Sequence, residues 1–358
     1  MHSLCSKFVV NAARGSCNSL GRHKRQQKSL TKHCSHILKT NNSFFSSEHF
    51  NFNTMTSTNG TSSSLLVDEL LTAHPLMRVK DKPRVEGLLK SLIDGGVDKL
   101  QLVVDFDHTL TRTKNEKGQT LDCSWGVLEN SPLLSEDYTK ECGAIKAHYL
   151  PIEHDPHMSI EEKIPHMVEW YTKANLALQR SGVHKSDFSN MVKASNVDFR
   201  EGSNQMLSYL LDAGIPVLVL SAGVGDLIVE ILKAKGAHHS NLKVVSNFLA
   251  YDNDGNVTGL DGEIIHVYNK NENAIHDSDY FKVLQSRHNV ILLGDSLGDL
   301  HMADGIENPE AVLKIGFLNA NIEERLDNYM NLYDIVLMDD QTMNLPFQII
   351  KKIGQTQN

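Results

Sequence analysis

The segment 99–107, KLQLVVDFD, constrains the fold of this chain more than any other stretch. It is an almost continuous apolar run that ends in two carboxylates, Asp105 and Asp107. A short apolar run without regular polar alternation is typical of a strand that is covered on both faces, as in a parallel sheet. The segment therefore predicts a buried strand that leads directly into two acidic side chains.

Similar apolar runs recur later in the chain, at 215–223, 289–296 and 334–340. Segments with apolar residues at helical spacing separate them, including 202–214 and 225–236. Strands that alternate with helices in this way predict a doubly wound α/β fold built on a parallel sheet.

Polar side chains follow three of these predicted strands. Asp105 and Asp107 end the first strand, Ser221 ends the second and Asp295 ends the third. Ligands of doubly wound folds bind beyond the carboxyl ends of the strands, so we expect these four side chains to meet at one rim of the sheet.

The acidic side chains at this rim predict a metal site. Asp105 and Asp107 are two residues apart and share one face of an extended strand, where two carboxylates repel unless a cation lies between them. Asp295 supplies a third carboxylate. Oxygen ligands without thiolates favour a hard ion, and Mg²⁺ is the usual ion where a phosphate shares the coordination sphere. One Asp-x-Asp alone would be explained as a turn or helix cap, but three strand ends together favour the site.

The segment 114–200 interrupts the strand and helix alternation and is typical of helices, most clearly at 159–182. There Ser159 and Glu162 form a capping-box pattern. We therefore predict a core made of 65–113 and 201–358, with a helical cap domain inserted at 114–200.

The first part of the chain, 1–64, has a different composition. No Asp or Glu occurs before Glu48, whereas Lys and Arg are spread among Ser, Asn and His. This pattern is typical of an organellar transit peptide, and a disordered basic arm explains it equally well. We expect a cytoplasmic protein, with a mitochondrial or plastid form if the arm is a targeting segment.

Composition limits the partners of the chain. Its 358 residues carry a formal charge of −9, which argues against a general nucleic-acid-binding protein. No apolar run reaches the roughly 18 to 20 residues needed to cross a bilayer. The five cysteines have no C-x-x-C spacing, so neither a zinc site nor a disulfide framework is indicated. We expect a monomer with a small-molecule substrate and with neither a nucleic-acid nor a membrane partner.

Four motifs appear in the order found in the haloacid dehalogenase-like (HAD-like) phosphohydrolase superfamily, which the chain resembles: DFDHTLT, LSAG, the Lys of VYNKNE, and GDSLGD. Longer stretches narrow the resemblance to the cytosolic 5′-nucleotidase III, or pyrimidine 5′-nucleotidase, family. They are EEKIPHMVEWYTKAN, LSAGVGDLIVEIL, VVSNFLAYD, GEIIHVYNK and ILLGDSLGDLHMADG, within residues 84–353.

The resemblance implies the chemistry of the motif residues. Asp105 would be the nucleophile that forms an aspartyl phosphate, and Asp107 the general acid and base. The carboxylates of Asp105 and Asp295, with the main-chain carbonyl of Asp107, would hold Mg²⁺. Ser221 and the main chain of Ala222 would bind the phosphate.

The resemblance also implies roles for a lysine and for residues that would contact the nucleotide base. Lys270 would offset the negative charge of the carboxylates and the phosphate. Glu153, in the cap, would accept hydrogen bonds from the base. Trp125 could stack on a base, although core packing is the commoner role of a single Trp. Asp299 either orients Lys270 or caps a helix, and we leave it outside the predicted site.

The predicted function is a Mg²⁺-dependent 5′-nucleotidase that hydrolyses CMP and UMP through an aspartyl phosphate, with phosphotransferase activity as an extension. Ala174 stands where relatives often carry Ser, which leaves open a specificity for 7-methylguanosine monophosphate. A phosphatase for a small non-nucleotide ester such as phosphoserine is a further alternative. A catalytically inactive binding protein is disfavoured because all four motifs are complete.

Overall fold

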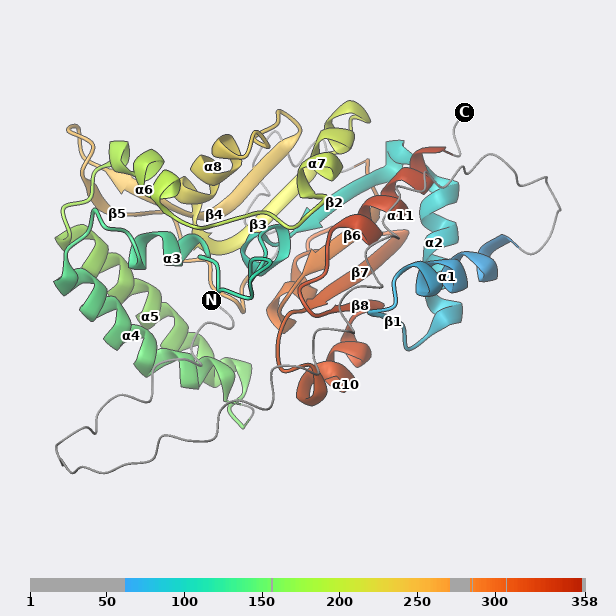
Figure 1. The fold of residues 1–358 in the computed structure, drawn as a ribbon, viewed down its shortest axis with the longest axis horizontal. Coiled ribbons are helices and arrows are strands. Elements are labelled where there is room, and N and C mark those ends of the chain that lie inside the picture. Colours follow the sequence, from blue (N-terminus) through green and yellow to red (C-terminus); the bar gives the residue numbers. More distant parts are fainter. Residues whose placement is uncertain (1–61, 156, 271–283, 285, 307, 356–358) are drawn as a thin grey trace, which may run out of the picture. The chain divides into compact units, whose positions relative to one another are not determined.

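The computed structural model describes residues 62–155, 157–270, 284, 286–306 and 308–355 (Figure 1). The predicted basic arm, 1–64, lies outside the described residues except for its last three positions, which begin helix α1 (Ser62–Ala73) instead of ending the arm.

A mixed sheet forms the centre of the fold, with the strand order β1-β8-β7-β6-β2-β3-β4-β5. The strands are β1 (Met77–Arg78), β2 (Leu100–Val104), β3 (Val217–Val224), β4 (Leu242–Tyr251), β5 (Val257–Asp261), β6 (Asn289–Gly294), β7 (Ala311–Leu318) and β8 (Ile335–Met338). The strands from β8 to β4 run parallel, and β1 and β5 pair antiparallel at the two edges. This arrangement confirms the predicted doubly wound α/β fold.

Successive residues of the central strand β2 point into different hydrophobic cores. Leu102 and Val104 belong to one core, and Val103 between them belongs to the other. Side chains alternate in this way because a strand has a period of two residues. Burial on both faces explains why the strand sequence is apolar almost throughout.

Helices cover both faces of the sheet (Figure 1). Leucine, isoleucine and methionine side chains of α2 (Lys82–Gly95), α7 (Ser203–Asp212), α8 (Gly225–Ala234) and α11 (Asn344–Gln355) pack into the core that contains Leu102. Residues of α10 (Ile322–Leu332) and of the 3₁₀ segment η5 (Leu297–His301) pack into the core that contains Val103.

The segment predicted to form a helical cap lies between β2 and α7 and is mainly helical, as expected. It contains α3 (Ser124–Glu129), α4 (Glu136–His154), α5 (Ile160–Arg180), the 3₁₀ turn η3 (Lys185–Asp187) and α6 (Phe188–Ala194). Helices α4 and α5 pack side by side as a hairpin (Figure 1). The predicted capping box is confirmed, because Ser159 Oγ accepts a hydrogen bond from Glu162 N while the Glu162 carboxylate accepts one from Ser159 N.

The chain leaves the core and returns to it at the same place. Thr111 and Phe199 form an antiparallel bridge between the outgoing and the returning linker. The bridge is extended by a hydrogen bond from Arg200 N to Leu110 O, 2.9 Å long. The two linkers therefore form a short two-stranded junction where the inserted segment leaves and rejoins the rest of the chain.

Arg200 connects this junction to the rest of the fold through hydrogen bonds. Its guanidinium is fully buried and donates to the main-chain oxygens of Thr109 and His108, to Asn319 Oδ1 and to Asp340 Oδ1. Asp340 also accepts hydrogen bonds from the main-chain N–H groups at 113 and 114, on the outgoing linker. One buried ion pair thus connects both linkers to the loop after β8.

Four of the six parallel strands were predicted from their apolar runs, whereas β4 and β7 were not. Lys314 interrupts the run of β7, and Ser246 and Asn247 interrupt that of β4. Each polar group finds a partner in the fold: Lys314 Nζ donates to Leu300 O at 2.9 Å, and Ser246 Oγ to Gly223 O at 2.9 Å. Such strands are hard to recognise because their compensating contacts come from distant parts of the chain.

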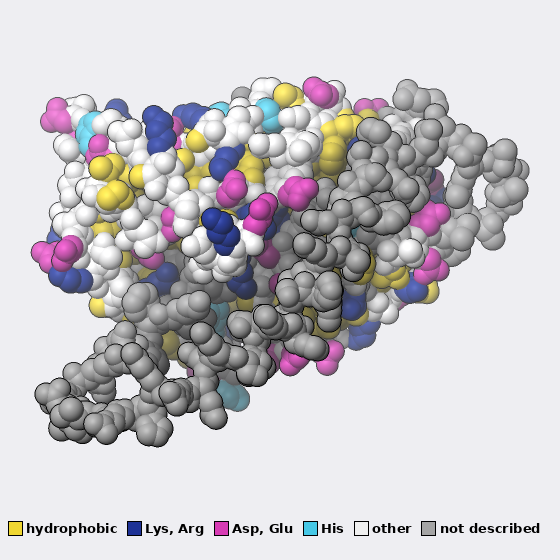
Figure 2. Space-filling model, in the orientation of Figure 1, with side chains coloured by type: hydrophobic (Ala, Val, Ile, Leu, Met, Phe, Trp, Pro, Cys, Tyr) yellow, Lys and Arg dark blue, Asp and Glu magenta, His cyan; other side chains and the backbone are white. Residues whose placement is uncertain are grey.

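Acidic and basic side chains are interspersed over the described part of the face drawn in Figure 2. Among the described residues, no helix combines the length and the apolar character that a membrane crossing requires.

Candidate active site

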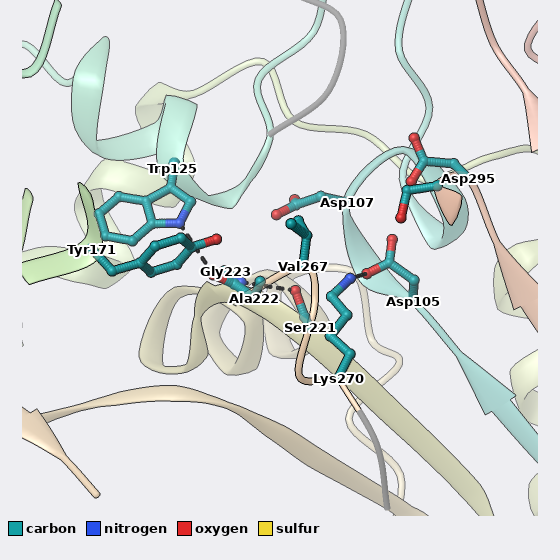
Figure 3. A pocket seen from close by; sticks show the side chains of 11 residues that line it. Asp105, Asp107, Trp125, Tyr171, Ser221, Ala222, Gly223, Val267, Lys270 and Asp295 are labelled. Atoms are coloured by element: carbon teal, nitrogen blue, oxygen red, sulfur yellow. Dashed lines mark hydrogen bonds and ion pairs between the residues drawn. The ribbon is translucent and has the colours of Figure 1, made fainter. Parts of the chain in front are cut away.

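A pocket opens at the carboxyl ends of the three central strands β2, β3 and β6 (Figure 3). From β2 the chain proceeds to β3 on one side, and it later returns to place β6 on the other side. Ligand sites of doubly wound folds lie at such a reversal of strand order. The pocket is lined by Asp105, Asp107, Trp125, Tyr171, Ser221, Ala222, Gly223, Val267, Lys270, Asp295 and Ser296.

The turn after β2 brings both of its carboxylates to the pocket. Asp105 N donates to Leu293 O of β6 at 2.9 Å, which keeps Asp105 in line with the sheet. Asp105 and Asp107 both have extended backbone angles, with ψ of 157° and 125°, so their side chains share one face. His108 then adopts a left-handed conformation with φ of 63°, and the chain turns away.

Lys270 joins two buried carboxylates at the base of the pocket. Its Nζ lies 2.6 Å from Asp105 Oδ1 and 2.9 Å from Asp299 Oδ1. All three side chains are at most 6% exposed. Burial alone would lower the pKa of Lys270, but the two carboxylates outweigh it and raise this pKa, so the side chain is an ammonium.

The two carboxylates that share Lys270 have opposite pKa shifts. Burial raises the pKa of Asp105 to about 8; Lys270 opposes this change, and the charges of Asp299 and Asp295 add to it. Burial also disfavours ionised Asp299, yet Lys270 and hydrogen bonds from Ser296 lower its pKa below the usual value. One ammonium therefore compensates Asp299 well, but the excess negative charge of the surrounding carboxylates makes the metal-free Asp105 hold a proton more tightly.

This excess charge and the arrangement of the oxygens fit a metal ion. Asp105, Asp295 and Asp299 each offer one oxygen, and these oxygens lie within 4.8 Å of one another. Asp299 Oδ2 already accepts hydrogen bonds from Asp295 N, Ser296 N and Ser296 Oγ, and its Oδ1 accepts from Lys270. Asp105 lies between Lys270 and Asp295 (Figure 3), so Asp105 and Asp295 are the carboxylates best placed to hold a cation.

Asp107 lies at the same rim but has different partners. Its Oδ1 accepts a hydrogen bond from Ser124 N at 2.7 Å, and its Oδ2 accepts one from Ser124 Oγ. Ser124 is the first residue of α3 and belongs to the cap. The two carboxylates of the Asp-x-Asp motif are thus held by different parts of the chain, Asp105 by Lys270 and Asp107 by Ser124 at the start of α3.

The end of β3 forms the wall next to Asp107. Ser221 Oγ accepts a hydrogen bond from Gly223 N at 3.0 Å, within the irregular last part of β3. Ala222 O accepts hydrogen bonds from Asn247 Nδ2, at 3.1 Å, and from Trp125 Nε1, at 3.4 Å. The predicted phosphate-binding residues Ser221 and Ala222 therefore line the same pocket as the three aspartates and Lys270.

The cap contributes an aromatic wall to the pocket. Trp125 and Tyr171 are buried and meet edge to face, with ring centroids 6.0 Å apart. Figure 3 shows both rings on the side of the pocket away from Lys270. Trp125 is therefore both a packed side chain, as expected for a single Trp, and a pocket residue.

Glu153 lies near this wall but is not a lining residue of the pocket. It is 5% exposed, at the end of α4, and its main-chain oxygen accepts hydrogen bonds from Lys163 Nζ and Tyr268 Oη. The pKa of Tyr171 is raised, first by burial and then by the charge of Glu153, which places the two side chains in one electrostatic environment. The predicted contact of Glu153 with a base remains a prediction.

Several pocket residues were not predicted from sequence, namely Tyr171, Gly223, Val267 and Ser296, together with Ser124 behind Asp107. Tyr171 lies on the buried face of α5, where its spacing from Met167 indicates only core packing. Ser124 has no sequence signal, because its contact depends on how the cap meets the core.

Strand-end aspartates, a buried lysine and a serine in the last part of β3, beneath an inserted helical cap, define a phosphohydrolase of the HAD-like superfamily. The chain belongs to the pyrimidine 5′-nucleotidase (UMPH-1) family, whose sequence profile matches residues 108–354. It is accordingly a 5′-nucleotidase, a phosphoric monoester hydrolase that acts on small nucleotide substrates.

Three relatives illustrate the similarity. The chain is 42% identical to human 7-methylguanosine phosphate-specific 5′-nucleotidase, over 80% of this chain and 95% of the human protein. It is 36% identical to the Drosophila melanogaster protein of the same name, over 77% of this chain and 86% of that protein. It also resembles the crystal structure of cytosolic 5′-nucleotidase IIIB bound to cytidine, with a TM-score of 0.75 and 33% identity over 82% of this chain and 98% of that one.

Proposed function

We propose that this enzyme is a Mg²⁺-dependent 5′-nucleotidase that prefers 7-methylguanosine 5′-monophosphate. The observation that carries this choice is the 42% identity, over nearly the whole human protein, to a 7-methylguanosine phosphate-specific 5′-nucleotidase. The alternative of the sequence analysis thus has better support than its main prediction, hydrolysis of CMP and UMP.

The cap side of the pocket offers a physical reason for the preference. A guanine methylated at N7 carries a positive charge, and the faces of aromatic rings attract cations. Trp125 and Tyr171 line the pocket, and the buried carboxylate of Glu153 adds negative charge beside Tyr171. Aromatic rings near a carboxylate suit a cationic purine better than a neutral pyrimidine.

CMP is the second candidate substrate. The related cytosolic 5′-nucleotidase IIIB has been crystallised with cytidine, so a site of this kind accepts a pyrimidine nucleoside. Glu153 could accept hydrogen bonds from the cytosine amino group, as the sequence analysis proposed. Activity toward both nucleotides is compatible with one pocket, and their order of preference distinguishes the two proposals.

In the proposed reaction Asp105 attacks the phosphorus and the nucleoside leaves, which gives an aspartyl phosphate on Asp105 that water then hydrolyses. Lys270, 2.6 Å from Asp105 Oδ1, offsets the negative charge that the phosphate adds to the carboxylates. Ser221 and the main chain at Ala222, at the end of β3, would hold the phosphoryl oxygens.

Asp107 is proposed to move the protons. As an acid it protonates the 5′ oxygen of the departing nucleoside, and as a base it takes a proton from the attacking water. The aspartyl phosphate could also be attacked by a hydroxyl of another nucleoside, which would give phosphotransferase activity.

The carboxylates of Asp105 and Asp295 and the main-chain carbonyl of Asp107 would hold Mg²⁺. When bound, the ion neutralises charge on the phosphoryl oxygens. We further propose that the cap spans 114–200 and excludes water over this site, and that the enzyme is a cytoplasmic monomer, in line with the cytosolic name of its structural relative.

Phosphate release tests the proposal. The enzyme is assayed with 7-methylguanosine monophosphate, CMP, UMP, AMP and phosphoserine, each in Mg²⁺ and in EDTA, with Asp105→Asn as the inactive control. We expect metal-dependent turnover with the highest kcat/KM for the methylated purine. A higher kcat/KM for CMP and UMP would replace the proposed substrate, and substantial turnover by Asp105→Asn would contradict the aspartyl phosphate.

A further inference from the structure

The contact between Ser124 and Asp107 joins the cap to the core inside the active site. Ser124 is fully buried and meets both oxygens of the Asp107 carboxylate, one with its N–H and one with its hydroxyl. Both residues are buried, so water cannot readily replace these donors. A hydrogen bond to a charged group in such surroundings is stronger than one between neutral groups.

The wall opposite Ser124 leaves room for its hydroxyl. A Cβ added at Gly223 would lie 2.2 Å from Ser124 Oγ and 3.0 Å from Asp107 Oδ2. Any larger residue at the end of β3 would therefore displace the serine hydroxyl from the carboxylate. Gly223 is needed at this position because three segments, the turn after β2, the end of β3 and the start of α3, meet there.

We propose that Ser124 is a positioning residue for Asp107 in the reaction of this enzyme. The inference rests on the proposed role of Asp107 as the proton donor and acceptor. The N–H of Ser124 holds Asp107 Oδ1 and its hydroxyl holds Oδ2, so the two donors together fix the orientation of the carboxylate.

Ser124 is also the neighbour of a pocket-lining residue in the chain. The next residue, Trp125, lines the pocket and donates to Ala222 O of β3. When α3 lies against β3, the aromatic wall and the support of Asp107 are in place together. Binding of a substrate beneath the cap and alignment of the proton-transferring group are therefore coupled through two neighbouring residues.

The test is the Ser124→Ala variant of the full chain, with steady-state kinetics on 7-methylguanosine monophosphate and CMP. The substitution removes the hydroxyl and keeps the N–H. We expect kcat to fall roughly 10- to 100-fold, a part of the roughly 10²- to 10⁴-fold that a positioned acid or base supplies. KM should change less than about threefold, because Ser124 supports Asp107 and does not hold the nucleotide.

Ser203→Ala is the matched control. Ser203 is also fully buried, and its hydroxyl donates to a main-chain oxygen, Leu110 O at 3.2 Å, away from Asp107. Equal kinetics of the two alanine variants would overturn the inference, and so would a Ser124→Ala variant that changes KM and leaves kcat intact. The Asp107→Asn variant distinguishes failure of the proposed role of Asp107 from failure of the proposed role of Ser124. If Asp107→Asn retains wild-type kcat, the proposed role of Asp107 fails; if it is inactive while Ser124→Ala matches the control, only the role of Ser124 fails.

Discussion

Lowering the pH from 8 to 6 should weaken Mg²⁺ binding to this enzyme, because a proton competes with the metal for Asp105. Asp105 is buried among Asp295, Asp299 and Lys270, and its pKa in the metal-free site is raised to about 8. A metal binds the ionised carboxylate, so each bound ion must displace the proton that Asp105 carries below this pH.

The size of the effect follows from the ionised fraction. A group with a pKa of about 8 is about half ionised at pH 8 and about 1% ionised at pH 6, so the apparent affinity should fall about 50-fold. Even a pKa one unit lower would give about a tenfold change over the same range. An unperturbed aspartate with a pKa of about 3.9 would give almost none.

Isothermal titration calorimetry of Mg²⁺ into the full chain at pH 6, 7 and 8 measures this dependence. Repeating the titration in buffers of different ionisation enthalpy counts the protons released, and we expect close to one per ion at pH 6. An affinity that changes less than about threefold from pH 6 to 8, with no proton release, would refute the argument that burial and the neighbouring carboxylates raise the pKa of Asp105.

Three further perturbations test other contacts. The free energy of unfolding of the metal-free enzyme should fall as the pH rises from about 4 to about 8, by up to about 1.4 kcal/mol per pH unit, because folding raises the pKa of Asp105 and the folded state holds the extra proton. Urea unfolding in EDTA should show this slope, and the Asp105→Asn variant should lack it. Lys270→Met leaves two buried carboxylates unpaired and should cost about 3 to 5 kcal/mol in the same assay, with kcat lowered at least about 100-fold. Arg200→Lys offers three donors in place of a planar fork of five, and thermal unfolding should show a loss of about 2 to 4 kcal/mol.

The strand ends of the site could be predicted from sequence because each lies within one local pattern. An apolar run that stops at a polar residue indicates both the strand and its end. Asp105 and Asp295 directly follow β2 and β6, whereas β3 continues past Ser221 to Val224. Parallel strands present these ends at the same edge, so three local signals predict one pocket. Lys270 lies outside any strand, and only the family resemblance identified it before the structure placed its Nζ beside Asp105.

Contacts between segments far apart in the chain could not be predicted. Ser124 and Asn319 are ordinary polar residues in the sequence, and their partners, Asp107 and Arg200, lie 17 and 119 positions away. Arg200 would be expected on the surface, yet it is buried among acceptors from three separate segments, at 108–109, 319 and 340–341. No local periodicity contains that information, because the buried charge of Arg200 is acceptable only after these three segments have met around it.

The paired linkers at Thr111 and Phe199 bear on how such an enzyme can diversify. Because the two ends of the insertion lie side by side, the core has the same short gap to close whether the inserted segment is long or short. A lineage can therefore exchange, lengthen or redesign the inserted helices without altering the strands that carry Asp105, Ser221 and Asp295 to the pocket. The paired linkers then act as a constant attachment point for the insertion. The same sheet can be combined with different inserted segments, and a new substrate requires changes mainly in one contiguous block of the gene.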